Sequence, residues 1–143
     1  MKRLFFTLAL AAATAATPLR AASDEEVAAR KLALEVAGAF SNDGFKLRDG
    51  HWCGKFEPGK PALIQVNLYA GNQYWFTVGA TEAAKKIAVT VFDEAGQPVT
   101  SEPYADASVA AAGFAPKNSG PYYIRLELSE GAASAFCLIY SYR

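Results

Sequence analysis

Few residues in this sequence are of the types that catalyse reactions or bind metal ions. His51 is the only histidine, which excludes a histidine-rich zinc site. No Ser/His/Asp or Cys/His order around it is distinctive. Because it stands beside Trp52 and Cys53, we interpret His51 as a strand residue near a disulfide. The sequence therefore predicts no catalytic residue, and we do not expect an enzyme.

The acidic residues form no pattern typical of a metal site. Asp93 and Glu94 precede Gly96, an arrangement typical of a turn. Paired catalytic carboxylates or a calcium contact are the alternatives at this position. Three further loop acids lack the spacing of an EF-hand, namely Asp43, Asp49 and Asp106. We therefore expect no bound metal and no cofactor.

The two cysteines, Cys53 and Cys137, are the only pair in the chain. In an exported protein such a pair is most simply a structural disulfide. A redox-active pair would normally show close spacing, such as Cys-x-x-Cys. The sequence thus predicts a single Cys53–Cys137 bridge, provided that the chain leaves the cytoplasm.

Residues 1–21 have the features of a bacterial Sec-type signal peptide. A basic start at Lys2 and Arg3 precedes the apolar run Leu4–Ala16, which is too short to span a bilayer comfortably. Cleavage is expected after Ala21, with cleavage after Ala16 as the alternative. The mature chain should then be periplasmic or extracellular, without membrane insertion; an uncleaved anchor is the other interpretation.

The charge of the mature chain excludes two classes of partner. Removal of Lys2, Arg3 and Arg20 leaves 11 basic residues against 14 acidic ones, a net charge of −3. Without a basic stripe, the chain lacks the electrostatic footprint of a nucleic-acid binder. It also lacks the clustered Lys and Arg that attract anionic membranes. About 120 residues remain, enough for one domain.

One helix is predicted at the start of the mature chain. Ser23 stands three residues before Glu26, the capping-box spacing that satisfies two backbone amides. An apolar stripe follows at Leu32, Val36 and Phe40. A stripe of this kind favours packing against a sheet rather than a free helix.

The remainder of the chain has the alternation of half-buried strands separated by turns. We predict strands at 51–56, 64–68, 74–78, 87–92, 97–100, 122–128 and 135–142, with a hairpin between the second and third. A long loop is expected over 101–116, and a short strand around 108–111 is the alternative for part of it. The predicted fold is mainly β, an antiparallel jelly-roll-like β-sandwich with one N-terminal α-helix. The expected organisation is a signal peptide (1–21), a helical segment (22–44) and a β-sandwich domain (45–143).

Three aromatic residues are out of phase with the predicted core positions. Tyr69, Trp75 and Tyr123 would therefore lie either on one outer sheet face or beneath the N-terminal helix. If exposed, they form a candidate binding face for sugar rings or for a protein partner. If the helix covers them, they serve only its packing.

Three segments resemble the bacterial pre-peptidase C-terminal-like (PPC-like) domains. Leu68–Phe76 is similar to their L-x-A-G-x-x-Y-x-F hairpin, Val89–Val99 to their strand, D-x-x-G turn and strand, and Gly120–Leu126 to their late tyrosine-containing strand. The resemblance covers about Phe56 to Tyr142. It implies a secreted jelly-roll-like sandwich that is not itself an enzyme and serves as an accessory module beside an exoenzyme. Some members of the family bind calcium or an extended polymer.

One departure from the family pattern bears on calcium. The acidic run that often enters the strand before the D-x-x-G turn is replaced here by Lys85 and Lys86. Their charge repels a divalent cation, so we do not expect calcium to stabilise the domain. The sequence predicts an exported, non-catalytic binding or accessory module with an unknown protein or polysaccharide partner. A carbohydrate-binding module, and an inhibitor or accessory subunit of a secreted hydrolase, are the two alternatives.

Overall fold

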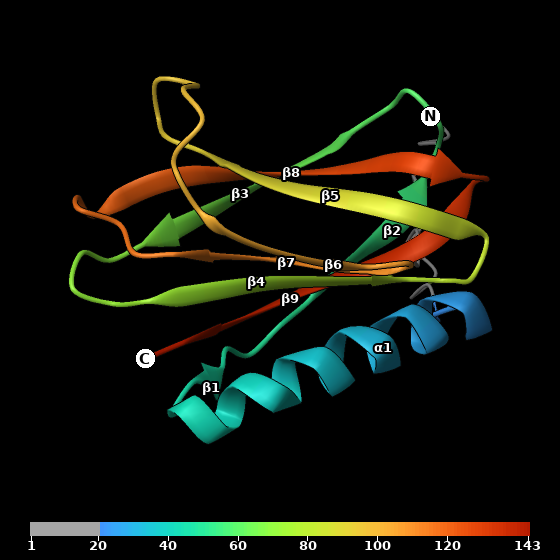
Figure 1. Cartoon of the computed structure of the whole chain (residues 1–143), viewed down its shortest axis with the longest axis horizontal. Coiled ribbons are helices and arrows are strands. Elements are labelled where there is room, and N and C mark those ends of the chain that lie inside the picture. Colours follow the sequence, from blue (N-terminus) through green and yellow to red (C-terminus); the bar gives the residue numbers. More distant parts are fainter. Residues whose placement is uncertain (1–20) are drawn as a thin grey trace, which may run out of the picture.

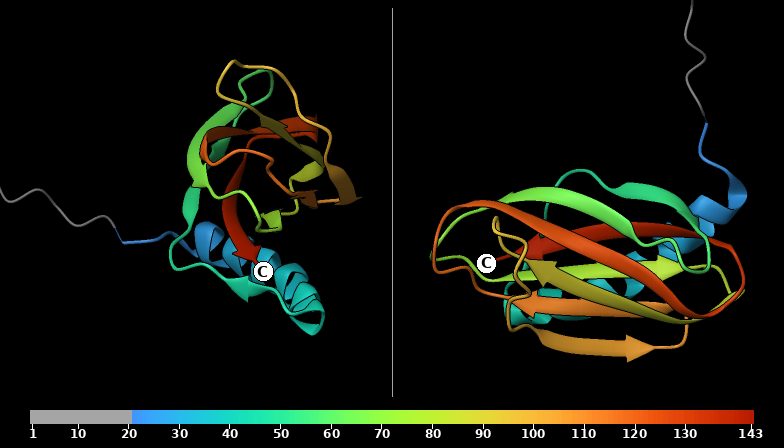
Figure 2. Two further views of the ribbon diagram at one scale, coloured as in Figure 1. Left: turned by 90° about the vertical axis from the view of Figure 1, so that its left-hand side faces the viewer. Right: turned by 90° about the horizontal axis from the view of Figure 1, so that it is seen from above.

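A computed structural model describes residues 21–143, in which two antiparallel sheets face each other across an apolar core (Figure 1). Helix α1 lies outside the larger sheet, as the side view in Figure 2 also shows. The predicted fold class, an antiparallel β-sandwich with one N-terminal helix, is confirmed. The predicted signal peptide lies outside the described residues except for Ala21.

The sheets differ in size, and the strands alternate between them along the chain. The larger has the order β1-β9-β4-β7-β6, with β2 also paired to β9, and the smaller has the order β3-β8-β5. The strands are β1 (Lys46–Leu47), β2 (Trp52–Phe56), β3 (Ala62–Leu68), β4 (Tyr74–Ala80), β5 (Ala84–Phe92), β6 (Glu102–Asp106), β7 (Val109–Phe114), β8 (Gly120–Gly131) and β9 (Ser134–Tyr142).

The core consists of the inward-facing residues of both sheets. Phe76 and Leu138 from the larger sheet and Ile124 and Leu126 from the smaller one are completely buried. Burying a side chain of this size stabilises the fold by roughly 1.5–3 kcal/mol. The alternation of polar and apolar residues along the strands thus fixes which face of each sheet points inward.

The predicted hairpin between β3 and β4 is wrong. β3 pairs with β8, whereas β4 pairs with β7 and β9, so the turn between β3 and β4 crosses from one sheet to the other. The apolar sets of both strands still face the same core, but from opposite sides. Alternation cannot distinguish these two arrangements, because a hairpin and a crossover bury the same residues.

The segment after β5 also differs from the prediction. The expected strand at 97–100 is reduced to one bridge between Phe92 and Pro98. The expected long loop over 101–116 holds two paired strands, β6 and β7, of which β7 overlaps the short strand considered around 108–111. All five residues of β6 are exposed, which explains why the sequence lacks an alternating pattern there.

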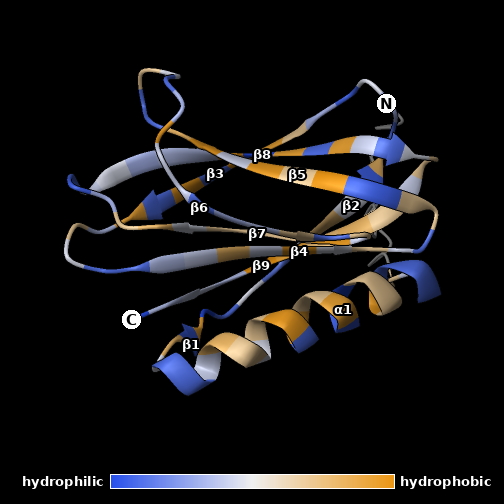
Figure 3. Ribbon diagram, in the orientation of Figure 1, coloured by the Kyte–Doolittle hydropathy of each residue, from blue (hydrophilic) through white to orange (hydrophobic). Residues whose placement is uncertain are grey.

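Helix α1 (Asp24–Phe40) begins at the predicted capping box. The Ser23 hydroxyl accepts from the Glu26 amide at 3.2 Å, and the Glu26 carboxylate accepts from the Ser23 amide at 3.4 Å. The helix is followed by a single 3-10 turn, Ser41–Asp43, and by Gly44 in the left-handed conformation. Acidic residues occupy the first turn of the helix, and the polar 3-10 turn follows its apolar last residues (Figure 3).

The centre of the helix contact is formed by small residues rather than by the predicted stripe. Ala29, Ala33 and Ala37 are buried, whereas the stripe of Leu32, Val36 and Phe40 is half-buried beside them. The close approach depends on Gly79 of β4. A Cβ atom at this position would lie 2.6 Å from the Ala33 amide nitrogen and would also clash with the Ala29 carbonyl oxygen.

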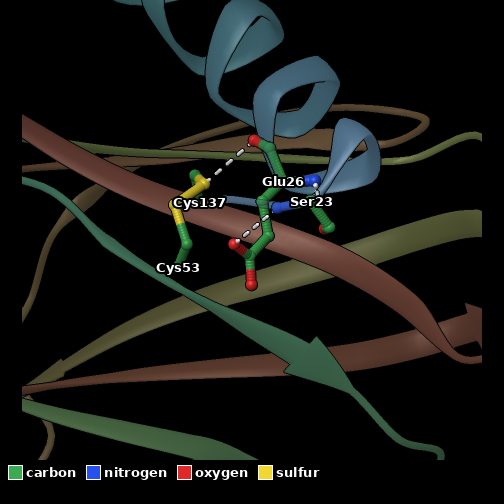
Figure 4. The surroundings of a disulfide bond; sticks show 4 residues. All are labelled: Ser23, Glu26, Cys53 and Cys137. Carbon is green, nitrogen blue, oxygen red and sulfur yellow. Dashed lines mark hydrogen bonds between the residues drawn. A yellow bond between two sulfur atoms is a disulfide. The ribbon is translucent and has the colours of Figure 1, made fainter. Parts of the chain in front are cut away.

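The predicted disulfide is present. Cys53 on β2 and Cys137 on β9 lie directly opposite each other in the antiparallel register and are joined by a disulfide bond (Figure 4). The Cys137 sulfur lies 3.3 Å from the main-chain oxygen of Glu26, so the bridge also contacts the first turn of the helix. A structural disulfide fits a protein located outside the cytoplasm.

Candidate ligand-binding site

The structure places the three predicted aromatic residues in three different environments. Trp75 lies on the helix side of the larger sheet, where the Phe40 ring stacks on it at 4.4 Å. Tyr123 lies on the outer face of the smaller sheet, half-buried. Tyr69 follows the end of β3 and is 60% exposed. The prediction that they share one face is therefore wrong, and helix cover applies to Trp75 alone.

Tyr69 instead borders a hollow at one end of the sandwich, which we call the tyrosine hollow. Its volume is about 440 Å³. Tyrosine rings supply half of its lining, and charged or amide side chains supply most of the rest. The lining residues are Leu47, Arg48, Asp49, Tyr69, Asn72, Tyr74, Tyr140 and Tyr142.

Strand register explains why these tyrosines gather. Tyr74, the first residue of β4, pairs with Tyr142, the last residue of β9. Tyr140 lies two residues before Tyr142 and therefore points to the same side of the sheet, toward the space between the sheets. The hollow consequently lies where the inward-facing row of side chains reaches the end of the sandwich, near β1 and the β3–β4 turn.

The floor and the rim of the hollow differ in exposure. Tyr74 and Tyr140 form the floor, and each is only 3% exposed. At the rim, Tyr69 is 60% exposed, Leu47 is 50% exposed and Tyr142 is 37% exposed. The rim thus offers exposed ring and aliphatic surface above a floor that presents phenol groups.

Hydrogen bonds hold the floor in a defined geometry. The Tyr74 hydroxyl oxygen accepts from the Tyr69 amide at 2.9 Å and from the Asn72 side-chain amide at 3.1 Å. Both acceptor positions of this oxygen are then used. Its own hydrogen remains free to donate to a molecule in the hollow.

Arg48 extends over the buried Tyr140. Its guanidinium carbon lies 5.4 Å from the centre of the Tyr140 ring, a cation–π distance. The Arg48 amide also donates to the Tyr140 carbonyl at 3.0 Å, which fixes the main chain at this position. On the same ring, Trp52 stacks at 5.6 Å. Arg48 is thus held in place by contacts within the fold.

Burial raises the pKa of the Tyr140 phenol above its ordinary value of 10.0, and the hydroxyls of Tyr74 and Tyr69 add to the shift. Arg48 opposes this rise in pKa, through its positive charge and through a side-chain hydrogen bond to the phenol. Burial dominates because a phenolate loses its hydration when it is removed from water. Tyr140 consequently remains a neutral hydrogen-bonding group throughout the physiological pH range.

This shift predicts a loss of stability in alkaline solution. The unfolded chain ionises this phenol near pH 10.0, and the folded chain only at higher pH. The contribution of the neutral phenol is fully present below pH 10 and is lost as the pH rises through the folded-state pKa. Denaturant unfolding between pH 8 and 11.5 should therefore show a smaller alkaline decrease in the free energy of unfolding for Tyr140→Phe than for the wild type. Parallel pH profiles would contradict this assignment.

A second hollow lies on the outer face of the smaller sheet. It also has a volume of about 440 Å³ and includes Tyr123, with Leu63 as its most exposed apolar side chain at 63%. Its lining is less polar than that of the tyrosine hollow; the other members are Phe92, Glu94, Ala95, Gly96 and Arg125. Arg125 is paired with Glu127 at 3.3 Å, so its charge is already compensated.

Residues 21–143 contain neither a cluster of metal-binding side chains nor a membrane-spanning helix. No group of three or more His, Cys, Asp or Glu side chains in this part of the chain could hold a metal ion. Nor does it contain a helix long and apolar enough to cross a membrane. Asp93 makes the contact expected of a turn residue, since its carboxylate accepts from the Gln97 amide at 2.8 Å.

Comparison with known proteins adds no family assignment. The sequence matches no protein-family model, and no curated protein is similar to it. The PPC-like resemblance therefore stays a proposal.

Proposed function

We propose that this chain is a Sec-exported, non-catalytic β-sandwich of a bacterial periplasm or cell exterior, which binds a saccharide in the tyrosine hollow. The observation that carries the proposal is the combination of exposed Tyr69 and Tyr142 rings with the hydrogen-bonding floor of Tyr74 and Tyr140. The disulfide supports the compartment. The PPC-like resemblance is consistent with an accessory module of this kind.

The chemistry of the hollow suits a sugar ring. A pyranose presents a C–H face that packs on an aromatic ring and hydroxyl groups that need hydrogen-bond partners. Tyr69 and Tyr142 offer the ring surface, and Tyr74 and Asn72 offer polar groups whose positions are fixed by their mutual hydrogen bond. A volume of about 440 Å³ falls within the range of small-molecule sites.

The proposal is tested by binding to an array of neutral and acidic oligosaccharides, followed by titration of the strongest binder. Tyr69→Ala should weaken binding about tenfold, because the loss of one stacking ring costs on the order of 1–1.5 kcal/mol. The matched control is Tyr104→Ala, since Tyr104 is an exposed tyrosine on β6, outside the hollow. It should bind as the wild type does.

Two results would contradict the proposal. Absence of binding to every oligosaccharide would favour an inhibitor or accessory subunit that recognises a protein. Equal losses in the Tyr69 and Tyr104 variants would show that binding does not occur at the hollow.

A further inference from the structure

We propose that the saccharide bound in the tyrosine hollow is anionic, and that Arg48 binds its carboxylate or sulfate group. This inference rests on the proposed function and specifies the class of ligand. It follows from the charge and the position of a single side chain, and from the absence of a carboxylate partner for that side chain within residues 21–143.

Arg48 is the only cationic side chain that lines the hollow. Within residues 21–143, no carboxylate lies within ion-pair distance of its guanidinium group; the ion pairs there join Lys31 to Glu35, Lys60 to Glu57, Lys86 to Glu130 and Arg125 to Glu127. A guanidinium group has five N–H donors in a planar fork that matches a carboxylate or sulfate. Arg48 can therefore offer a bidentate contact to a ligand.

The position of Arg48 favours binding in the hollow rather than free motion in solvent. Its main-chain amide is hydrogen-bonded to Tyr140 of β9, and its guanidinium group lies over the Tyr140 ring. The main-chain contact uses no side-chain donor, whereas the guanidinium group also hydrogen-bonds to the Tyr140 phenol. A guanidinium group has five N–H donors, so others remain for a ligand. Less conformational entropy is lost on binding when a side chain is already positioned.

The phenols of the floor also favour a ligand rich in acceptors. The Tyr74 oxygen already accepts two hydrogen bonds, so it can act toward a ligand only as a donor. Asp49 is the one anionic residue in the lining. The Asp49 carboxylate can accept hydrogen bonds from the hydroxyl groups of a sugar ring, whereas Arg48 can bind the carboxylate or sulfate group of the same ligand.

The test compares tetragalacturonic acid with its fully methyl-esterified form, which has the same backbone without the charge. A sulfated galactan tetrasaccharide distinguishes a sulfate ligand from a carboxylate. Calorimetric titrations use the full mature chain and the variants Arg48→Gln and Arg48→Lys. Arg125→Gln, which removes a cation from the outer face of the other sheet, is the matched control.

We expect the acid to bind about tenfold more tightly than its methyl ester, as for one charge-assisted contact. Arg48→Gln should remove this difference, Arg48→Lys should retain part of it, and Arg125→Gln should retain all of it. Raising the NaCl concentration from 50 to 300 mM should weaken binding of the acid but not of the ester. Tight binding of the sulfated galactan, lost in Arg48→Gln, would extend the ligand class to sulfate esters and support the same inference.

The failure of this inference differs from the failure of the proposed function. Equal binding of acid and ester, unchanged in Arg48→Gln, would overturn the inference and leave the saccharide site intact. Absence of binding to all three saccharides and to the neutral oligosaccharides of the array would overturn both. Melting temperatures of the variants identify any loss of fold, because Arg48 also contacts Tyr140.

Discussion

Replacing Cys53 and Cys137 together by alanine is expected to lower the free energy of unfolding by about 4.5 kcal/mol in the chain-entropy account of disulfides. The bridge joins residues separated by 84 positions, and cross-linking so long a loop strongly restricts the unfolded chain. A decrease of this size lowers the melting temperature by roughly 15 °C for a domain of this length. Thermal unfolding followed by circular dichroism measures it.

Chemical reduction provides the control for the disulfide prediction. A reductant should lower the melting temperature of the wild type toward that of the double variant and leave the variant unchanged. In addition, intact mass after alkylation without reductant should show no modified thiol in protein purified from an oxidising compartment. A wild-type protein that melts at the same temperature with and without reductant would contradict the prediction.

Deleting residues 22–41 from the mature chain is expected to lower the free energy of unfolding by about 3–5 kcal/mol. The deletion removes the buried Ala29, Ala33 and Ala37 and the half-buried residues beside them. It also uncovers Ile139, which is 4% exposed in the intact protein, and the ring of Trp75. Newly exposed apolar surface of this kind promotes association.

Tryptophan fluorescence and sedimentation measure this effect. Of the two tryptophans, Trp75 stacks on Phe40 of the helix, whereas Trp52 stacks on Tyr140 away from it. We therefore expect the deletion to increase acrylamide quenching of Trp75 fluorescence but not of Trp52 fluorescence. Introducing Trp52→Phe into both the full-length and the truncated protein isolates the signal of Trp75. A truncated domain that melts unchanged and stays monomeric would show that the helix is a free arm.

Two glycine substitutions test the contact between the helix and β4 without removing the helix. Gly79→Ala puts a methyl group against the helix backbone and should cost about 1–3 kcal/mol, as overpacking does. Gly38→Ala, in the helix itself, has open space around the new methyl group. It should instead stabilise the protein by about 0.5–1 kcal/mol.

The sequence contained most of the information for the fold class. Alternation identified the inward face of β3, β4, β5 and β8, because burial on one side of a sheet imposes a period of two. The capping box located the start of α1, and the cysteine pair identified a contact between β2 and β9. Alternation and the capping box are local signals, and the disulfide could be predicted because the chain has only two cysteines.

Strand pairing and the binding site could not be predicted in the same way. The β3–β4 turn has hairpin chemistry but connects two sheets, since pairing is decided by distant strands. The tyrosine hollow requires the ends of β4 and β9 to meet, and nothing local to Tyr74 or Tyr142 specifies this. The period-two spacing of Tyr140 and Tyr142 beyond Cys137 was the one available signal, because the disulfide fixes the register of that strand. Arg48 offered none.

The central position of β9 has a consequence for how the chain matures. β9 is the last of the described strands, yet it pairs with β1, β2 and β4, carries Cys137 and packs against α1. β1 and β2, which are synthesised early, pair with no strand other than β9, so they cannot join the larger sheet before β9 is complete. Folding is therefore a check of completeness: a product that ends before Ser134 leaves β1 and β2 without a partner strand and Cys53 without Cys137, and it remains a substrate for proteases.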